Sequence, residues 1–286
     1  MNNIVLDVDG HRCVATVLYH RNGEFKIKLP REKLHDFCIH LSKSIEIYFY
    51  FNMKWSEIIL SHIANELKAV GFSNVKLVCP YLPFGRANKP EKEYGCRKDI
   101  LSTFFKMLKA AEIDEVCTSD FHLNIKSNIF HGIKFRNIKF SELWQEEITK
   151  ISRLHNKEKF LVFAPDGGAL ERAWQTWTVL SYNLPSNPLY CKHIQFCKER
   201  TENGIEMSDG GNYANNEQYQ NRICIIVDDM VDSGKTMLAA IEKVRAFKPK
   251  KIYVLATHLL NKEFKAPADV VFKNYFDLSE ENYGNH

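Results

Sequence analysis

The sequence of 286 residues lacks long apolar runs, cysteine pairs in a CxxC spacing, and segments in which charge of one sign accumulates. No apolar run is long enough to cross a bilayer, and the beginning, MNNIVLDVDGHRC, does not have the order of a secretory signal. The eight cysteines are scattered, so neither a disulfide framework nor a zinc site is predicted. With 39 basic and 35 acidic side chains the net charge is +4, without a basic stripe for nucleic acid. We therefore expect a soluble, cytoplasmic protein with reduced cysteines and no membrane or nucleic-acid partner.

What the sequence does contain is a repeated alternation of short β-branched runs and stretches with helical periodicity. SIEIYFYF is followed by the amphipathic SEIILSHIANELKAVG, and the same order returns later in FLVFAPD, ALERAWQTWTVL and ICIIVDD. This alternation is typical of βαβ units around a parallel sheet. It predicts an α/β protein of two tandem domains, residues 1–141 and 142–286, each a mainly parallel sheet flanked by helices. Residues 85–98 and 181–221 fit neither pattern and are interpreted as long functional loops.

The most informative stretch is IIVDDMVDSGKT, residues 225–236. Asp228 and Asp229 fall at the end of a buried strand, where the ligands of open parallel sheets bind. The turn that follows consists of Asp232, Ser233, Gly234, Lys235 and Thr236. Because this turn leads into a helix, its backbone N–H groups and the positive helix end can hold an anion. Carboxylates beside a phosphate pocket would bind ribose hydroxyls and, directly or through water, a magnesium ion. The stretch therefore predicts a sugar-phosphate site.

Two other interpretations apply to this stretch. Paired aspartates after a buried strand can merely cap the next helix, and a DSG turn is common, so this alternative stays open. A P-loop is the competing phosphate motif because it also contains GKT. It is excluded, since the motif requires a glycine five residues before Gly234, where this chain has Asp229.

VDDMVDSGKT resembles the phosphoribosyl-diphosphate motif of type I phosphoribosyltransferases and of ribose-phosphate pyrophosphokinases, also called PRPP synthetases. Five further segments resemble those of the pyrophosphokinases and follow the same order along the chain: RNGEF (residues 21–25), CPYLPFGRANK (79–89), TSDFHLN (118–124), FAPDGGALERA (163–173) and CKERTENG (197–204). The chain is therefore identified as a divergent member of the ribose-phosphate pyrophosphokinase family, with two domains of the phosphoribosyltransferase fold.

The resemblance implies roles for individual residues. Those implied in ATP binding are Asn22, Glu24, Arg86, Lys89 and His122. Those implied in binding the ribose phosphate are Asp228, Asp229, Asp232, Ser233, Gly234, Lys235 and Thr236. His122 and Asp166 are implied in holding Mg²⁺, and Lys198 and Arg200 in catalysis on a mobile loop. Taken alone, His122 can equally be an ordinary histidine at a strand end, and the two loop cations can be solvated surface charges.

The reaction implied is transfer of the β,γ-diphosphoryl group of ATP to the C1 hydroxyl of ribose 5-phosphate, which gives PRPP and AMP. Such transfers are accelerated mainly by in-line positioning and by neutralising the charge of the phosphoryl oxygens. Mg²⁺, Lys198 and Arg200 are expected to supply that positive charge, while closure of the loop excludes water. In the family the RNGE segment completes the ATP site of a neighbouring subunit, so we expect a homo-oligomer.

The sequence departs from the family pattern at several positions. Ala87 and Asn88 replace the glutamine and aspartate that follow the arginine of the ATP segment. Lys235 stands where the pyrophosphokinases usually have a second glycine, and a lysine there is more typical of purine phosphoribosyltransferases. The connection before the catalytic loop is longer than in the family, and the helix that precedes it carries Trp174 and Trp177.

These departures leave three alternatives to the synthesis of PRPP from ribose 5-phosphate. An extra cation and aromatic side chains favour a larger acceptor that contains ribose 5-phosphate, such as ADP-ribose, although both tryptophans can also be core residues. A phosphoribosyltransferase that uses PRPP is favoured by DSGKT alone. A non-catalytic relative that regulates a synthetase is expected to lose the metal and loop residues, whereas this chain retains them.

Overall fold

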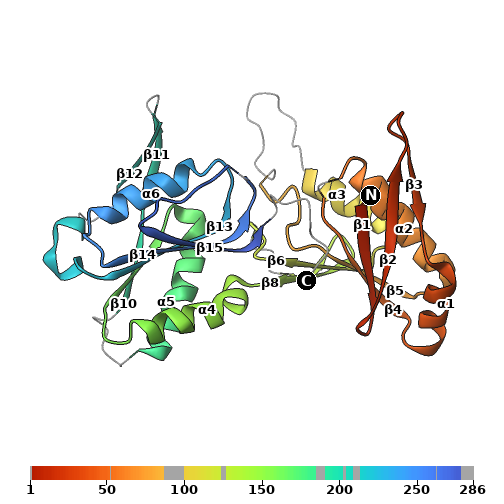
Figure 1. Ribbon diagram of the computed structural model, residues 1–286, viewed down its shortest axis with the longest axis horizontal. Coiled ribbons are helices and arrows are strands. Elements are labelled where there is room, and N and C mark those ends of the chain that lie inside the picture. Colours follow the sequence, from red (N-terminus) through yellow and green to blue (C-terminus); the bar gives the residue numbers. More distant parts are fainter. Residues whose placement is uncertain are drawn as a thin grey trace. The chain divides into compact units, whose positions relative to one another are not determined.

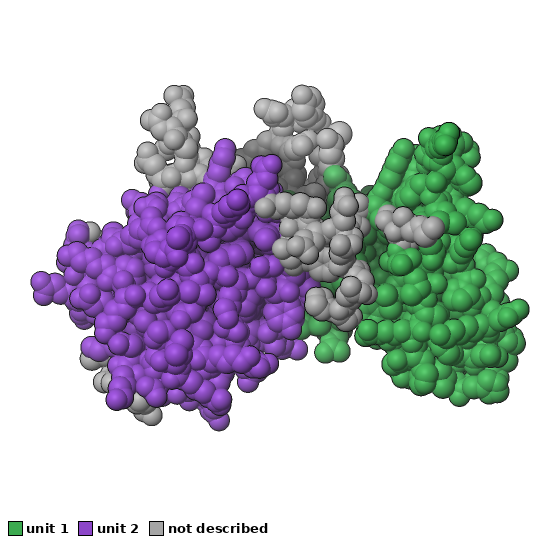
Figure 2. Space-filling model, viewed as in Figure 1, with its two compact units in different colours: residues 1–138, 282–286 green, residues 139–281 purple. Residues whose placement is uncertain are grey.

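The computed structural model describes residues 2–51, 53–86, 100–123, 127–184, 191–201, 204–208, 213–261 and 263–277. The chain forms two compact units, residues 1–138 and residues 139–281, which we call unit 1 and unit 2 (Figure 1, Figure 2). Each unit combines a main sheet with helices, and the predicted α/β fold class is confirmed. In the described ranges, no helix has the length and apolar character needed to span a membrane.

Unit 1 is built on an eight-stranded mixed sheet. Its strands are β1 (Asn2–Val8), β2 (His11–Tyr19), β3 (Phe25–Lys28), β4 (Ser44–Tyr48), β5 (Asn74–Val78), β6 (Glu115–Ser119), β7 (Ile129–Phe130) and β8 (Ile133–Ile138). They are arranged in the order β3-β2-β1-β4-β5-β6-β8-β7, in which β4, β5, β6 and β8 are parallel neighbours and β1 to β3 and β7 are added antiparallel. Its helices in the described residues are α1 (Arg31–His40), α2 (Ser56–Val70) and α3 (Ile100–Ala110).

Unit 2 is built on a five-stranded sheet in which all neighbouring strands are parallel. The order is β10-β9-β13-β14-β15, formed by β9 (Phe160–Ala164), β10 (Cys191–Gln195), β13 (Ile223–Val231), β14 (Lys251–Leu259) and β15 (Val270–Asp277). The other elements described are α4 (Phe140–Leu154), α5 (Leu170–Asn183), α6 (Lys235–Arg245), the 3₁₀ turns η1 (Gly167–Ala169), η2 (Tyr213–Asn215) and η3 (Glu217–Tyr219), and a hairpin of β11 (Cys197–Thr201) and β12 (Gly204–Ser208).

The central strands of unit 2 are buried on both faces. In β13, Ile223 and Val227 pack with α4 and α5, whereas Cys224 packs on the opposite side with α6 (Figure 1). A parallel strand that is covered on both faces has a nearly continuous apolar sequence, as ICIIV has here. The first polar side chain of the strand is therefore Asp228, close to the carboxyl edge of the sheet.

The order of the strands places the two acidic motifs of unit 2 beside each other. From β9 the chain passes through α5 to β10 on one side, whereas from β13 it passes through α6 to β14 on the other side. Adjacent β9 and β13 therefore form a topological switch point, where open α/β sheets bind their ligands beyond the carboxyl ends. The PDGG segment follows β9, and the DDMVDSGKT segment ends β13 and leads into α6.

The interpretation of residues 181–221 as one irregular stretch is wrong in part. β10 lies within it and pairs in parallel with β9, from Cys191 opposite Phe160 to Gln195 opposite Ala164. β11 and β12 form the hairpin that follows. The strand was missed because it lies at the edge of the sheet, where only Cys191 and Ile194 are buried and the apolar pattern is correspondingly weak.

Candidate functional site

The predicted pair of aspartates lies where the apolar part of β13 ends. Asp229 is buried and Asp228 is half-buried, and the backbone N–H of Asp229 donates to Oδ1 of Asp228 at 2.9 Å. Helix capping is not the arrangement seen for this pair, because the N-cap of α6 is Gly234. The aspartates are thus held within the strand, at the edge of the sheet where a ligand can reach them.

A buried arginine that is not among the predicted site residues lies against Asp229. Nη2 of Arg172 is 3.7 Å from Oδ2 of Asp229, and the two side chains are only 9% and 6% exposed. Nη1 of Arg172 also donates to the carbonyl oxygen of Gly168 at 2.9 Å. Arg172 begins the buried stripe of α5, whose other members are Ala173, Thr176 and Leu180. No local pattern in the sequence distinguishes it from a solvated arginine on a helix surface.

The same arginine indirectly fixes Asp166. Asp166 is the N-cap of η1, and its Oδ1 accepts a hydrogen bond from the backbone N–H of Gly168 at 2.9 Å. Nη1 of Arg172 donates to the carbonyl oxygen of Gly168, and Nη2 of the same side chain lies against the carboxylate of Asp229. One guanidinium therefore joins the loop after β9 to the end of β13, so that the predicted metal ligand and the predicted ribose ligands share a support.

Negative charge is in excess around this guanidinium. Burial raises the pKa of Asp228 well above its ordinary range, the neighbouring carboxylates of Asp229 and Asp166 raise it further, and only Arg172 acts in the opposite direction. An ionised Asp228 is thus poorly compensated by the protein itself. Hydroxyl donors or a divalent cation bound at the site would stabilise the ionised form.

The turn between β13 and α6 has the backbone expected of an anion site. Gly234 is the N-cap of α6 and has φ 76° and ψ −9°, a left-handed conformation that favours glycine. The first N–H groups of a helix have no partner within the helix, and a glycine N-cap has no side chain to offer them. Asp232, Ser233 and Lys235 are exposed and Thr236 is half-buried. The turn can therefore offer an anion backbone amides, two hydroxyl groups and an ammonium group.

In unit 1, the loops that follow β5 and β6 are pressed together. A Cβ atom on Gly85 would lie 2.8 Å from Cε2 of Phe121, an approach that only glycine permits. The backbone N–H of Ser119 and the hydroxyl of Thr118 both donate to the carbonyl oxygen of Pro80 at 3.1 Å. Neighbouring parallel strands thus hold their carboxyl-end loops in contact.

These loops carry two of the predicted ATP-binding residues. Arg86 directly follows Gly85, His122 directly follows Phe121, and both are exposed. The contact between Gly85 and Phe121 brings the two segments together, although they are distant in sequence. Their roles in ATP binding, and that of His122 with a metal ion, stay predictions.

Asn22 and Glu24 lie elsewhere in unit 1, in the turn between β2 and β3. Both side chains are exposed, and Oδ1 of Asn22 accepts a hydrogen bond from the backbone N–H of Glu24 at 3.1 Å. Strands β1 and β4 separate this hairpin from β5 and β6 in the sheet. Unit 1 therefore does not bring Asn22 and Glu24 together with the loops of Arg86 and His122, and their contact with ATP stays a prediction.

Several predicted residues fall wholly or partly outside the described part of the chain. Lys89, Ala87 and Asn88 lie outside it. The backbone of Lys198 and Arg200 lies in β11, but their side chains are outside the described residues. A single residue separates the end of β10 from the start of β11, which therefore begins near the carboxyl edge of the unit 2 sheet.

The two tryptophans of α5 differ in their surroundings. Nε1 of Trp177 donates to the carbonyl oxygen of Cys191 at 3.1 Å, and its ring packs edge to face against His193, with the ring centroids 6.0 Å apart. Trp177 therefore packs α5 against β10, as the core-residue alternative expects. The side chain of Trp174 is 53% exposed.

Comparisons with known proteins agree with this architecture. A family described as phosphoribosyl transferase domain matches residues 141–285, which is about half of the chain. A ribose-phosphate pyrophosphokinase of Mycoplasma genitalium is 27% identical over 212 residues, which cover 74% of this chain and 57% of that protein. One of Pyrococcus abyssi is 30% identical over 204 residues, covering 68% and 61%. A crystal structure of phosphoribosylpyrophosphate synthetase from Mycobacterium smegmatis has a TM-score of 0.64 and 16% identity, and the match covers 91% of this chain and 85% of that one.

The chain belongs to the family of proteins with a phosphoribosyl transferase domain. Within it, the prediction of a divergent relative of the ribose-phosphate pyrophosphokinases is confirmed. The matches span only about three fifths of the length of these two relatives. The solved structure shows the fold of both units, and at 16% identity the likeness concerns the fold alone.

The two aspartates of β13 should respond in opposite ways to neutralisation. Asp228→Asn keeps the Oδ1 that accepts the N–H of Asp229 and removes a charge that the folded state disfavours, so we expect a higher melting temperature at pH 7. Asp229→Asn leaves the buried Arg172 without its carboxylate and should cost about 3 kcal/mol. For Asp228→Asn a gain of about 1 kcal/mol corresponds to about 2–4 °C. Thermal unfolding of the two variants and the wild type measures both effects.

The effect of pH gives the control for this experiment. Because the pKa of Asp228 is raised in the folded state, its ionisation destabilises the fold only above the ordinary aspartate value, where the unfolded chain is already ionised. The advantage of Asp228→Asn should therefore vanish below about pH 4 and grow as the pH rises above the ordinary aspartate value. Equal destabilisation by both variants at pH 7 would contradict the charge arrangement described above.

The contact between Gly85 and Phe121 should be required for ATP binding. Gly85→Ala places a methyl group against a ring that is itself packed on Phe135, with ring centroids 5.7 Å apart, so the loops must separate. We expect the Kd for ATP to rise at least about tenfold and stability to fall by about 1–3 kcal/mol. Calorimetric titration with Mg-ATP measures the Kd. The double variant Gly85→Ala and Phe121→Leu should recover part of the ATP affinity and part of the stability. Unchanged ATP affinity in Gly85→Ala would show that these loops do not form the ATP site.

Proposed function

We propose that the protein is a Mg²⁺-dependent diphosphotransferase, which moves the β,γ-diphosphoryl group of ATP to the C1 hydroxyl of a ribose 5-phosphate type acceptor and releases AMP. The observation that carries the proposal is the juxtaposition, at the carboxyl edge of one parallel sheet, of the acid pair of β13 with a glycine-capped helix start. Proteins named ribose-phosphate pyrophosphokinase are among its relatives, which supports the same reaction class.

The acceptor would occupy unit 2. The ribose hydroxyls donate hydrogen bonds to the carboxylates of Asp228 and Asp229, which relieves part of the negative charge that raises the pKa of Asp228. The 5′-phosphate lies on the turn from Asp232 to Thr236, where the N–H groups of the turn and the start of α6 receive it. The sugar is then held at two points, which fixes the direction of its C1 hydroxyl.

Unit 1 favours a diphosphotransferase over a phosphoribosyltransferase. A transferase that uses PRPP has no need of an ATP site and usually has a single domain of this fold. Here a second unit carries the apposed loops of Arg86 and His122, which are the ATP segments of the resemblance. The retained acid pair, PDGG loop and anion turn likewise favour an enzyme over a non-catalytic regulatory relative.

The residues present fit a magnesium ion delivered with ATP. Among the described residues, no group of three or more His, Cys, Asp or Glu side chains is arranged to hold a metal ion. Mg²⁺ in nucleotide sites is commonly bound by one or two carboxylates together with substrate phosphates and water. In unit 2, Asp166 is the residue that would hold it, and the excess of carboxylates around Asp228 is compatible with such a cation. In unit 1, His122 is the residue for which the resemblance implies a metal role. When bound, Mg²⁺ supplies positive charge to the phosphoryl oxygens.

The chemical step is an in-line displacement. The C1 oxygen of the ribose forms a bond to the β-phosphorus of ATP, the bond from that phosphorus to the α,β-bridging oxygen breaks, and AMP leaves with the electron pair. The proton of the C1 hydroxyl is lost to solvent. Lys198 and Arg200 on the β11–β12 hairpin would neutralise the charge that develops on the phosphoryl oxygens.

A larger acceptor such as ADP-ribose is the second candidate. Lys235 is exposed in the anion turn and could pair with an additional phosphate, which favours it. Trp177 gives no such support because its indole N–H is bonded to β10, so Trp174 is left as the aromatic side chain that could stack on a base.

The assay for the proposal is AMP release by purified protein with ATP and Mg²⁺, with either ribose 5-phosphate or ADP-ribose as acceptor. We expect AMP and a diphosphorylated sugar of matching mass in at least one reaction. Lys198→Ala and Arg200→Ala should each lower kcat by about 10²-fold or more, since each removes charge stabilisation of the transition state. Lys243→Ala, an exposed lysine near the end of α6, is the matched control and should leave kcat unchanged. AMP in neither reaction would refute the proposed function.

Self-association is part of the same proposal, since in the family the hairpin of Asn22 and Glu24 serves the ATP site of a neighbouring subunit. We expect sedimentation at assay concentration to show a homo-oligomer, and Glu24→Ala to raise the KM for ATP without dissociating it. A fully active monomer would contradict this prediction.

A further inference from the structure

The ring of Phe264 covers the backbone of the anion turn. A Cβ atom on Gly234 would lie 2.7 Å from Cε2 and 3.4 Å from Cγ of Phe264, and would also meet Cδ2. Carbon atoms in contact prefer separations of about 3.5–4.0 Å, so a side chain at position 234 does not fit under the ring. The left-handed φ of 76° is a second, independent reason for the glycine.

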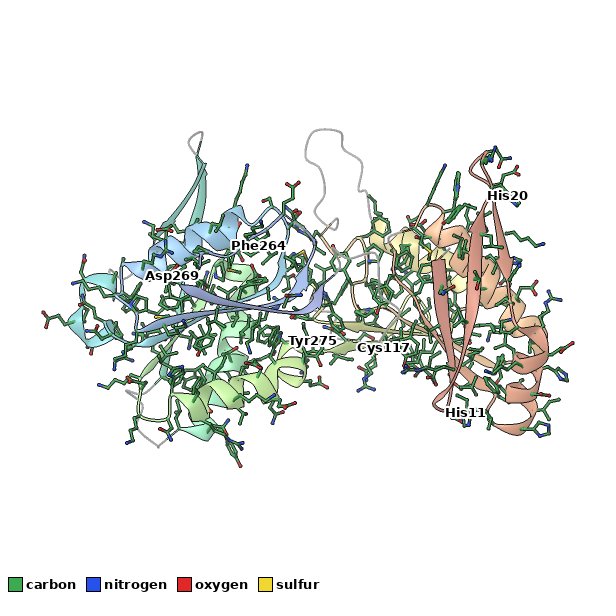
Figure 3. All side chains as sticks on the ribbon, viewed as in Figure 1. His11, His20, Cys117, Phe264, Asp269 and Tyr275 are labelled. Atoms are coloured by element: carbon green, nitrogen blue, oxygen red, sulfur yellow. The ribbon has the colours of Figure 1, made fainter. Side chains whose placement is uncertain are left out.

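Phe264 is itself held in place by neighbours. It follows β14, where the backbone N–H of Leu260 donates to the carbonyl oxygen of Val231 at 2.8 Å and so ties the ends of β14 and β13 together. Asn261 forms a local turn, accepting the N–H of Glu263 on its side chain at 2.9 Å and that of Phe264 on its carbonyl at 3.2 Å. Phe264 is labelled in Figure 3. Its ring packs edge to face on Phe272 of β15, with the ring centroids 5.1 Å apart. The ring therefore presses on Gly234 from a supported position.

We propose that Phe264 is a positioning residue of the anion turn, which keeps the N–H groups at the start of α6 directed at the acceptor's phosphate before the acceptor binds. Glycine has more backbone freedom than any other residue, so a turn that depends on Gly234 needs an outside contact to hold one conformation. A turn that is already ordered loses no backbone freedom when the phosphate binds, so the affinity for the acceptor is higher. Phe264 lies outside the DSGKT motif and has no assigned role in the resemblance.

The inference deepens the proposed function and rests on it for its kinetic test. Phe264→Ala should raise the KM for the acceptor by about tenfold, because the loosened turn must be ordered at binding. The kcat and the KM for ATP should change by less than about twofold, since the ring does not reach the reacting atoms in this account. Phe264→Tyr keeps the ring and should retain the wild-type KM.

Two further variants separate positioning from general stability. Phe247→Leu removes a fully buried ring from the same core, where it packs on Phe163 with centroids 5.1 Å apart and does not cover the turn. It should lower the melting temperature and leave the acceptor KM unchanged. Gly234→Ala should be strongly destabilised, and Phe264→Ala added to it should recover part of that loss, because the clash disappears. Strict additivity of the two substitutions would overturn the contact.

A measurement without turnover keeps the inference testable if the proposed function fails. Inorganic phosphate at millimolar concentration should raise the melting temperature of the wild type and of Phe247→Leu, and raise that of Phe264→Ala by less than half as much. If the wild type releases no AMP with either acceptor but this pattern holds, the proposed reaction is wrong and the role of Phe264 stands. Equal phosphate-induced shifts in wild type and Phe264→Ala, or no shift in the wild type, would overturn the role of Phe264.

Discussion

One buried guanidinium holds the candidate site together. Arg172 reaches Asp229 at the end of β13 and the carbonyl of Gly168 in the loop after β9, and that loop in turn fixes Asp166. Breaking a buried ion pair leaves an uncompensated charge, which is among the costliest changes a core can suffer. The side chain of Arg172 therefore links the acids at the ends of the two strands that flank the switch point. The order of the strands brings these strand ends together, and the positive charge of Arg172 reduces the repulsion between their carboxylates.

Arg172 compensates only part of the negative charge of these carboxylates, and the remaining charge suits the site to a ligand. Three carboxylates meet one guanidinium, and the pKa of Asp228 is raised by burial and by its acidic neighbours. A fold selected for stability alone would gain from a neutral side chain at this position, whereas a site for ribose hydroxyls and a divalent cation needs the charge. The anion turn follows the same logic, because a glycine N-cap in the left-handed conformation gives up a side-chain cap and leaves the helix start to a phosphate.

Much of the architecture could be predicted from the sequence, because its signals are local. The apolar run of β13, the acids that end it and the DSGKT turn are contiguous, and the pattern of alternating strands and helices determines that β9 and β13 belong to parallel sheets. Arg172 and Phe264 were missed for a physical reason. Each acts through a contact with residues remote in sequence, which no periodicity encodes, and an arginine on a helix is more often solvated. The edge strand β10 was missed because its exposed side removes half of the apolar signal.

The central claim is that the acid pair and the anion turn of unit 2 together bind a ribose phosphate. The most direct test is a crystal structure of the protein soaked with ribose 5-phosphate. The account predicts electron density for the sugar with its hydroxyls against Asp228 and Asp229 and its phosphate on the N–H groups that follow Gly234. Density for the phosphate at another place, with the acid pair and the turn unoccupied at saturating sugar, would contradict the account.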